Sequence, residues 1–382
     1  MDPSQSKPPR RLSRQLRLPD RRRLILGSGA LVLAGVGAGF VGLRQLGSMT
    51  EYDASVAETR SVLSARPEVR EYIRYATLAA NGHNTQPWRF QVRHDGVDIL
   101  PDLTRRTPAV DPDDHHLFAS LGCAAENLSI AAAAGGQPGQ LSSITIADGG
   151  VAFTFGDGPV SASLLASAIP QRQSTRAEYD GRAVSARDLQ ALAAAAAVPG
   201  MDMVLLTDRP RLDRLRDLVL AGNSAQMADA AFLRELKAWI RFNPHQAMAT
   251  GDGLFSGASG NPALPTWLGE QVFDHIFKVE AENQKYAQHL RSSAGVAVFV
   301  SQGADKSHWI AAGRAAQRFA LQATALGLKH AYVNQPVEIS SLRPELASLV
   351  GLPGRRPDLV MRFGYGPTLP FSCRRLVGSV LA

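Results

Sequence analysis

Two helical segments of this 382-residue chain carry the same pattern of small and apolar residues. The pattern, G-x-A-A-x-x-(L/F)-x-(I/L)-x-A-x-A-x-G, runs from Gly122 to Gly136 and again from Gly313 to Gly327. Small residues let a helix approach its neighbour closely, and the last glycine stands where a C-terminal cap is expected. Alanine-rich helices can also resemble each other by chance. The match therefore predicts an internal duplication, with chance similarity as the alternative.

The residues around these helices support the duplication. In each copy a helical run and a strand-like run come first, then the repeated helix, then another strand-like run. The flanking runs are 62–80, 89–92 and 144–147 in the first copy, and 185–197, 203–206 and 331–333 in the second. We expect one chain made of two related halves.

The segment Gly82-His83-Asn84-Thr85-Gln86-Pro87-Trp88 lies in the first copy only. Asn84 and Gln86 each offer donors and acceptors in a neutral group, which matches the edge of an isoalloxazine ring without burying a charge. This predicts the lip of a flavin pocket. His83 could hydrogen-bond the ring or a substrate, supply a proton near neutral pH, or cap the turn.

The segment Arg172-Gln173-Ser174-Thr175-Arg176 lies in the second copy only. Two guanidinium groups and a hydroxyl within five residues suit the terminal phosphate of FMN. A solvated, charged helix start is the alternative explanation for such a segment.

Together these motifs resemble the nitroreductase superfamily, and residues from about 55 to the C-terminus resemble its Acg-like branch. The resemblance implies an α+β, nitroreductase-like fold with two fused, pseudo-symmetric halves in one chain. The first half, 55–165, would supply the ring side of one flavin site, and the second half, 170–382, the phosphate side. Such an internal pseudo-dimer favours a monomer.

Two further stretches carry the resemblance. Residues 356–366 read as a buried strand that ends at glycines, and Arg374-Arg375 stands where the family often has a phosphate-binding arginine. Leu376 replaces the proline that commonly follows, which leaves open which arginine faces the phosphate. The implied site has His83 as a catalytic residue and these FMN-binding residues: His83, Asn84, Gln86, Arg172, Ser174, Arg176, Gly364, Arg374 and Arg375.

The resemblance also implies an activity. An FMN-dependent oxidoreductase would take electrons from a small-molecule donor and pass them in a second half-reaction to a nitroaromatic, quinone or similar acceptor. The alternatives are a protein that stores or sequesters FMN, a redox module fed by a partner, and a membrane-anchored interaction domain without a cofactor.

Two other segments have competing interpretations. The Gly- and Pro-rich stretch 243–269 could be a lid over the site or a surface insertion. The segment from Asp111 to His116 has the composition of a metal site, but its place before the repeated helix favours capping of that helix. We therefore expect no metal.

Most of the net charge of +7 lies at the N-terminus, where residues 1–23 hold eight basic and two acidic residues. The rest of the chain is nearly neutral, so nucleic-acid binding is not expected. Arg21, Arg22 and Arg23 precede 24–43, which has no charge and six glycines. Residues 1–47 predict a twin-arginine signal recognised by the Tat translocase, or an uncleaved membrane anchor. Either would place the folded body outside the cytoplasm, in the periplasm.

Cys123 and Cys373 are the only cysteines, too few for a disulfide framework. We expect both to be structural, with a bridge between them as the alternative in an exported protein.

Overall fold

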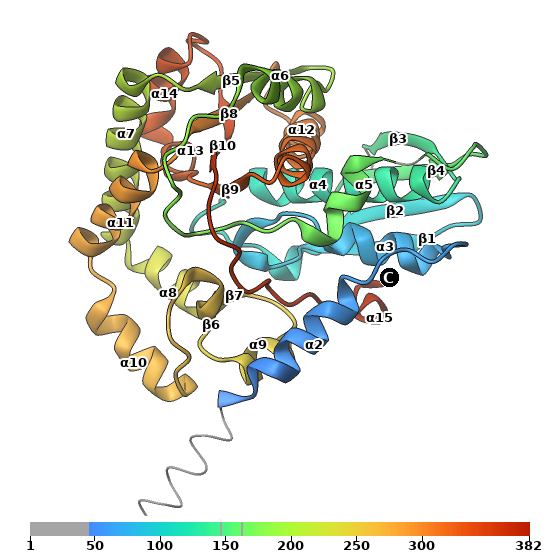
Figure 1. The fold of residues 1–382 in the computed structure, drawn as a ribbon, viewed down its shortest axis with the longest axis horizontal. Helices are drawn as coiled ribbons and strands as arrows, with labels where there is room; N and C mark the ends of the chain where they lie inside the picture. The colour runs from blue at the N-terminus through green and yellow to red at the C-terminus, as the bar shows by residue number, and fades with distance from the viewer. Residues whose placement is uncertain (1–45, 146, 162) are drawn as a thin grey trace, which may run out of the picture. The chain divides into compact units, whose positions relative to one another are not determined.

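The computed structural model describes residues 46–145, 147–161 and 163–382 (Figure 1). The hydrophobic segment 24–43 and nearly all of the predicted signal lie outside the described residues. Among the residues described, helix α4 (His115–Ala134) is long and apolar enough to cross a membrane, but 78% of its apolar window is buried within the protein. It is therefore a core helix.

The first half contains a four-stranded antiparallel sheet in the order β1-β2-β4-β3. Its elements, in chain order, are α2 (Met49–Thr59), α3 (Val69–Thr77), the 3₁₀ turn η1 (Gly82–Asn84), β1 (Trp88–Val92), β2 (Gly96–Pro101), η2 (Leu103–Arg105), α4, β3 (Gly139–Ile144), β4 (Gly150–Phe155), α5 (Leu164–Ala168) and η3 (Ile169–Gln171).

The second half contains a four-stranded antiparallel sheet in the order β5-β8-β10-β9. Its elements are α6 (Ala186–Ala195), β5 (Met201–Leu206), α7 (Arg209–Met227), α8 (Ala230–Trp239), β6 (Ile240–Arg241), α9 (Pro244–Thr250), β7 (Leu254–Phe255), η4 (Ser256–Ser259), α10 (Thr266–Ile276), α11 (Val279–Arg291), β8 (Gly295–Ser301), α12 (Lys306–Ala325), β9 (Lys329–Tyr332), α13 (Gln335–Glu338), η5 (Ser340–Leu342), α14 (Arg343–Leu349), β10 (Pro357–Gly364) and α15 (Val377–Val380).

The two sheets have the same topology. In each, the strands lie in the order first, second, fourth, third, and a 20-residue helix connects the second strand to the third. The α+β class and the two pseudo-symmetric halves are thus confirmed. The main difference is an insertion: β1 and β2 form a hairpin, whereas α7 to α11 separate β5 from β8.

Helices α4 and α12 form the centre of the molecule. Each contacts its own sheet and the other long helix, and the two lie close together in Figure 1. A Cβ atom on Gly122 would overlap the carbonyl oxygen of Ile310, and one on Gly313 would overlap that of Ala119. The repeated small residues therefore allow the two helix backbones to touch.

Some predicted boundaries were displaced. Helix α3 begins only at Val69, because Pro67 disfavours helix in the residue before it. The strand expected at 144–147 ends at Ile144, because Ala147 and Gly149 adopt positive φ in a turn. The strand expected within 356–366 is confirmed as β10, which is buried along its whole length.

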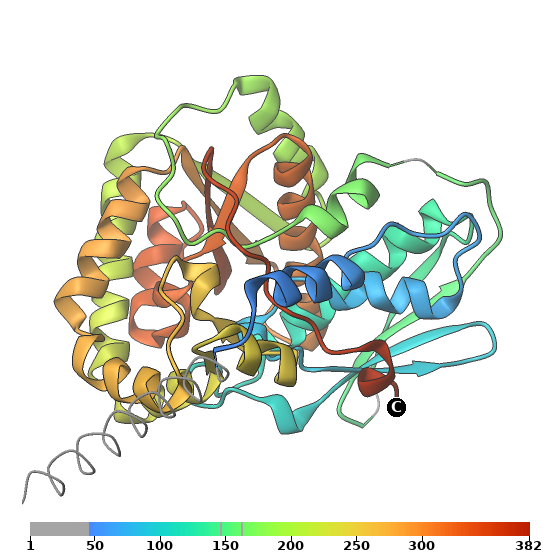
Figure 2. The same ribbon diagram turned by 60° about the horizontal axis from the view of Figure 1, so that its bottom comes forward.

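The C-terminal segment returns from the second half to the first. It leaves β10, runs past α2 and ends beside β1 (Figure 2). The hydroxyl of Tyr52 in α2 donates to Phe371 O at 2.5 Å, and the Ala382 amide donates to Phe90 O at 2.9 Å. This path carries the arginine pair of the C-terminal segment to the boundary between the halves.

Candidate functional site

Two adjoining cavities lie between the halves. The larger, here the wide cavity, has a volume of about 200 Å³, and the smaller, here the arginine cavity, about 40 Å³. Ala80, Asn81, Arg176 and Leu254 line both, so the two lie side by side. A ligand with one anionic end could occupy them together.

The arginine cavity collects four guanidinium groups from three separate parts of the chain. Arg60 follows α2, Arg172 and Arg176 follow η3, and Arg374 lies in the C-terminal segment. No acidic residue stands among the described residues that line this cavity. Ser174 also lines it. The cavity is therefore strongly electropositive.

The pKa values of all four arginines are lowered, and for Arg60 and Arg374 the crowding of the arginines is one cause. Burial, followed by the charge of Arg172, lowers the pKa of Arg374 to about 9. Burial, then Arg374 and Arg172, holds the pKa of Arg60 well below its ordinary value. Burial also lowers the pKa of Arg172 and of Arg176. Four like charges at one place disfavour each other unless an anion joins them.

The protein satisfies only part of this donor set. Arg374 Nε donates to Thr77 O at 2.8 Å and Arg172 Nη2 to Leu78 O at 2.9 Å, at the C-terminus of α3. The Nε and Nη1 atoms of Arg172 and the Nε atom of Arg60 are buried without a partner among the described residues. Guanidinium donors in this state fit a phosphate group.

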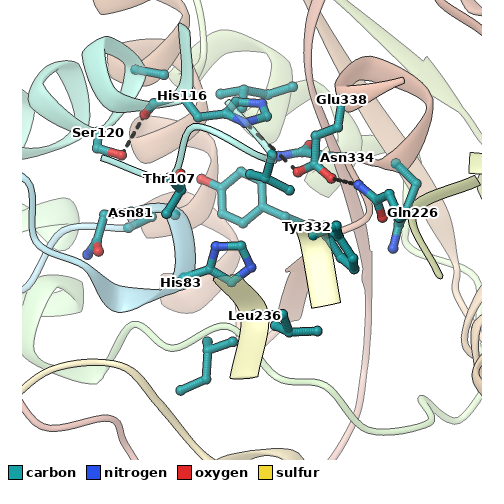
Figure 3. Close-up of a pocket in the computed structure, with 18 of the residues that line it drawn as sticks. Asn81, His83, Thr107, His116, Ser120, Gln226, Leu236, Tyr332, Asn334 and Glu338 are labelled. Carbon is teal, nitrogen blue, oxygen red and sulfur yellow. Dashed lines mark hydrogen bonds and ion pairs between the residues drawn. The ribbon is translucent and has the colours of Figure 1, made fainter. Parts of the chain in front are cut away.

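The wide cavity is built from both halves (Figure 3). Four of its residues bury a polar atom that has no partner in the described part of the chain: His83 Nδ1, His116 Nε2, Tyr332 Oη and Gln335 Oε1. Apolar side chains complete the wall, namely Phe232, Leu236, Leu254 and Phe277. Such a lining fits a ligand with an apolar body and several hydrogen-bonding groups.

His83 lies in the wide cavity, as expected of a site residue, but its imidazole does not titrate near neutral pH. Burial, followed by the charges of Arg176 and His116, lowers its pKa to about 4. The imidazole is therefore neutral at pH 7 and can offer or accept a hydrogen bond. His83 has a φ of 47°, in the left-handed region that non-glycine residues seldom adopt.

Asn84 and Gln86 are placed differently from the expectation that they face a ring. Asn84 lines the arginine cavity, but its Oδ1 accepts from Arg374 at 2.8 Å and its Nδ2 donates to Gly253 O at 3.0 Å. Gln86 is fully buried and lines neither cavity; its Nε2 donates to Gly251 O at 2.8 Å and its Oε1 accepts from the Arg375 amide at 2.9 Å. Both amides therefore hydrogen-bond to segments that are far away in the chain, around Gly251 and Arg374.

Gly364 and Arg375 also lie outside both cavities. Gly364 packs against the Tyr179 ring. Arg375 donates to Ser379 O at 2.8 Å and approaches Asp102 at 3.7 Å. Of the arginine pair, it is Arg374 that enters the arginine cavity.

Sequence reasoning missed several residues that line the cavities. Arg60 and Asn81 belong to no recognisable motif, and His116 and Glu338 lie more than two hundred positions apart. No local sequence pattern could have found them, because the cavities bring them together from distant parts of the chain.

The segment 243–269 contributes to the site through two residues. Leu254 lines both cavities and Ala258 lines the arginine cavity. Trp239, Arg241 and Trp267, which flank the segment or lie within it, line neither cavity. Arg241 instead pairs with Asp252 at 2.7 Å, its guanidinium lies over the Trp239 ring, and Trp267 remains 58% exposed.

Asp111, His115 and His116 place three potential ligand atoms within 4.8 Å of one another. Both Asp111 oxygens, however, accept from backbone amides at the start of α4, those of His116 and Leu117, each at 2.9 Å. His115 Nε2 lies 2.9 Å from Asp358 Oδ1. The capping interpretation of Asp111 is confirmed.

Cys123 and Cys373 are both buried free thiols. Cys123 donates to Gly313 O at 3.1 Å in the contact between α4 and α12. The expected structural role fits this placement.

Comparison with known proteins gives relatives over most of the chain, although no family model matches. Two Mycobacterium tuberculosis proteins, from strains CDC 1551 and H37Rv, carry the provisional name NAD(P)H nitroreductase. Each is 28% identical over 329 residues, which cover 82% of this chain and 90% of the relative. The chain is similar in sequence to nitroreductases.

Among solved structures, a nitroreductase with bound FMN from Desulfitobacterium hafniense matches with a TM-score of 0.36 and 15% identity, over 56% of this chain and 94% of that one. An FMN-dependent nitroreductase from Mycobacterium smegmatis in complex with NADPH matches with a TM-score of 0.35 and 13% identity, over 53% and 87% of the two chains.

Proposed function

We propose that this protein is an FMN-dependent oxidoreductase of the nitroreductase type. The observation that carries the proposal is the junction of an arginine cavity, which has no acidic lining residue in the described chain, with a wide cavity between the halves. FMN has the matching shape, with a phosphate at one end and a largely apolar ring system at the other. The sequence similarity to nitroreductases supports the same conclusion.

The residues that line the cavities fall into two groups, according to the part of FMN that they would contact. Arg60, Arg172, Arg176 and Arg374, with Ser174, would hold the phosphate, because all five line the arginine cavity and Arg60 and Arg172 have buried donors without a partner in the described chain. The buried polar atoms of His83, Tyr332 and Gln335 would meet polar groups of the ring system. When bound, FMN supplies reversible two-electron redox chemistry.

Asn84 would act indirectly. Its carbonyl oxygen holds Arg374 at 2.8 Å, so the amide would orient the guanidinium that meets the phosphate. Gln86 would support the same arrangement one step further away, by anchoring the backbone of Arg375.

A small-molecule donor and acceptor complete the proposal. NAD(P)H appears in the names of the relatives and is the donor to test first. Nitroaromatics and quinones are the acceptor classes, each reduced in a second half-reaction. The chain would work as a monomer, because both parts of the site come from one chain.

A second candidate is a protein that binds FMN without turnover on free substrates. The apolar residues Phe232, Leu236 and Phe277 on the wall of the wide cavity favour it, because they would shield a bound ring from solutes. Turnover with a small quinone separates the two candidates.

The cofactor is tested by producing the full chain and measuring FMN per chain from the visible absorption spectrum. We expect about one FMN per chain. Arg172→Met together with Arg374→Met should lower the FMN content strongly, whereas Arg375→Met, which removes one arginine charge outside the cavity, should retain it. A colourless protein that also fails to bind added FMN would overturn the proposal.

We further propose an internal duplication as the origin of the two halves, supported by their shared strand order and the repeated helix pattern. Export by the Tat translocase to the periplasm, with membrane anchoring as the alternative, rests on residues 1–47 alone. Fusing residues 1–47 to a reporter that is active only after export tests it, and replacing Arg21, Arg22 and Arg23 by Lys should abolish the reporter signal.

A further inference from the structure

His116 and Glu338 face each other across the wide cavity (Figure 3). His116 lies in the first turn of α4 and Glu338 ends α13, so the pair joins the two halves. His116 Nδ1 lies 3.9 Å from Glu338 Oε1, and Glu338 Oε2 accepts from Gln226 Nε2 at 2.5 Å. The other ring nitrogen, His116 Nε2, is buried without a partner in the described chain.

The surroundings shift both members of this pair toward their uncharged forms. Burial lowers the pKa of His116, against the opposite influence of Asp111, and burial raises the pKa of Glu338. Both shifts favour a neutral imidazole and a protonated carboxyl group. His115 in α4 faces the pair, and the titratable or charged groups that face it from other parts of the chain are Asp111, Arg356, His83, Arg176 and Tyr286.

We propose that His116 and Glu338 form a proton relay for an acceptor bound in the wide cavity, such as a quinone. In this relay His116 Nε2 gives its proton to a carbonyl oxygen of the acceptor, and Nδ1 receives the proton of Glu338 Oε1. The inference rests on the proposed function, because it assigns the proton that the reduction consumes.

The step balances. Reduction of a quinone to a hydroquinone adds two electrons and two protons. A hydride equivalent from the reduced flavin accounts for both electrons and one proton, and the relay supplies the other. The acceptor gains an O–H bond as the Nε2–H bond of His116 breaks. Glu338 is left as a carboxylate, which a proton from water then restores.

The distance between the two groups sets a condition. At 3.9 Å, Nδ1 and Oε1 are too far apart for a direct hydrogen bond, so the transfer passes through one water molecule or a small rotation of either side chain. Gln226 holds the second carboxyl oxygen, which limits Glu338 to orientations toward His116.

The test compares the full chain, loaded with FMN, with Glu338→Gln and His116→Asn. We expect each variant to retain FMN and its visible spectrum and to reduce a quinone about 10²-fold more slowly, a usual size for the loss of a general acid. The wild-type kcat should fall as pH rises through the apparent pKa of the pair, and Glu338→Gln should remove that limb.

A second readout needs no turnover. The infrared spectrum of the wild-type protein at neutral pH should contain a protonated carboxyl band that Glu338→Gln removes. As a control, Asp305→Asn changes a comparable pair, in which His308 Nδ1 lies 2.8 Å from Asp305 Oδ2 at the surface, and should leave the band and the rates unchanged.

The outcomes separate the relay from the proposed function. FMN-loaded variants with wild-type rates and pH profiles, or a Glu338 carboxyl group that is ionised at neutral pH, would overturn the relay alone. A wild-type chain that binds no FMN would overturn the proposed function and the relay with it.

Discussion

Gly122 and Gly313 occupy equivalent positions in the two halves, and each faces the backbone of the helix that carries the other. The carbonyl that Gly122 meets belongs to Ile310, three residues before Gly313, and the carbonyl that Gly313 meets belongs to Ala119, three residues before Gly122. The contact therefore has approximate two-fold symmetry within a single chain.

Substituting either glycine by alanine should force the two helices apart. We expect Gly122→Ala or Gly313→Ala to lower the free energy of unfolding by about 1–3 kcal/mol, as overpacking of a close contact does. Urea unfolding measures the change. Gly378→Ala is the matched control, because a Cβ there meets no atom within 4 Å. Equal stability of all four proteins would show that the helices can separate freely.

Anions should stabilise the protein without its cofactor through the arginine cavity. Inorganic phosphate should raise the Tm of the cofactor-free wild-type chain, because a ligand that binds only the folded state stabilises it. Potassium chloride at the same ionic strength should have a smaller effect.

Arg176→Met should weaken this response without lowering stability in the absence of phosphate. Among the described residues no group accepts a hydrogen bond from Arg176, so the substitution breaks none, and it removes a positive charge whose burial is unfavourable. Thermal unfolding with and without phosphate measures both effects. Arg375→Met should retain the wild-type response, and a response unchanged in Arg176→Met would exclude it from the anion site.

Buried histidines should make the protein sensitive to mild acid. The pKa of His83 falls from the ordinary 6.5 to about 4, and burial holds the pKa of His330 well below 6.5. Below pH 6.5 the unfolded chain therefore binds more protons than the folded chain. The histidines should therefore make the free energy of unfolding fall as the pH is lowered from about 6.5 to 4.

His330→Phe should reduce this loss. The His330 side chain is fully buried, and neither ring nitrogen has a partner in the described chain, so a phenyl ring replaces it without breaking a hydrogen bond. Urea unfolding across the pH range compares the two slopes. Identical slopes would mean that His330 does not contribute to the acid sensitivity.

Asn84 has an unusual backbone conformation and buried side-chain hydrogen bonds, and two substitutions can separate their effects on stability. Its φ of 54° favours glycine over other residues, while its amide makes buried hydrogen bonds to Arg374, Gly253 and Cys373. Asn84→Ala should lose both features and Asn84→Gly only the hydrogen bonds. We expect the alanine variant to be less stable than the glycine variant by about 1 kcal/mol in urea unfolding. The reverse order would show that backbone strain at Asn84 is negligible.

The two-half architecture could be predicted from the sequence because helices in close contact need small residues at fixed positions. The spacing of Gly122 and Gly313 within their helices is imposed by backbone contact, and no larger residue satisfies it. The position of β10 could be predicted for a related reason, since the apolar run Leu359-Val360-Met361 lies in a strand that is buried on both faces.

The site could be predicted from the sequence only in part. Arg172, Ser174 and Arg176 lie close together in the chain and in space. The orientation of a side chain, by contrast, depends on partners far away in the chain. Gln86 is turned from the cavities by the backbone of Gly251 and Arg375, and no local pattern specifies those contacts. The same holds for Arg60, which reaches the arginine cavity from the end of α2.

The burial of α4 has a consequence for synthesis of the chain. One side of this apolar helix is covered by its own sheet, and the other by α12, which lies almost two hundred residues later. When the ribosome has synthesised only the first half, the apolar face of α4 that α12 covers in the folded protein is still exposed. Until residues 306–325 emerge, the nascent protein depends on a chaperone or on the speed of translation to escape aggregation.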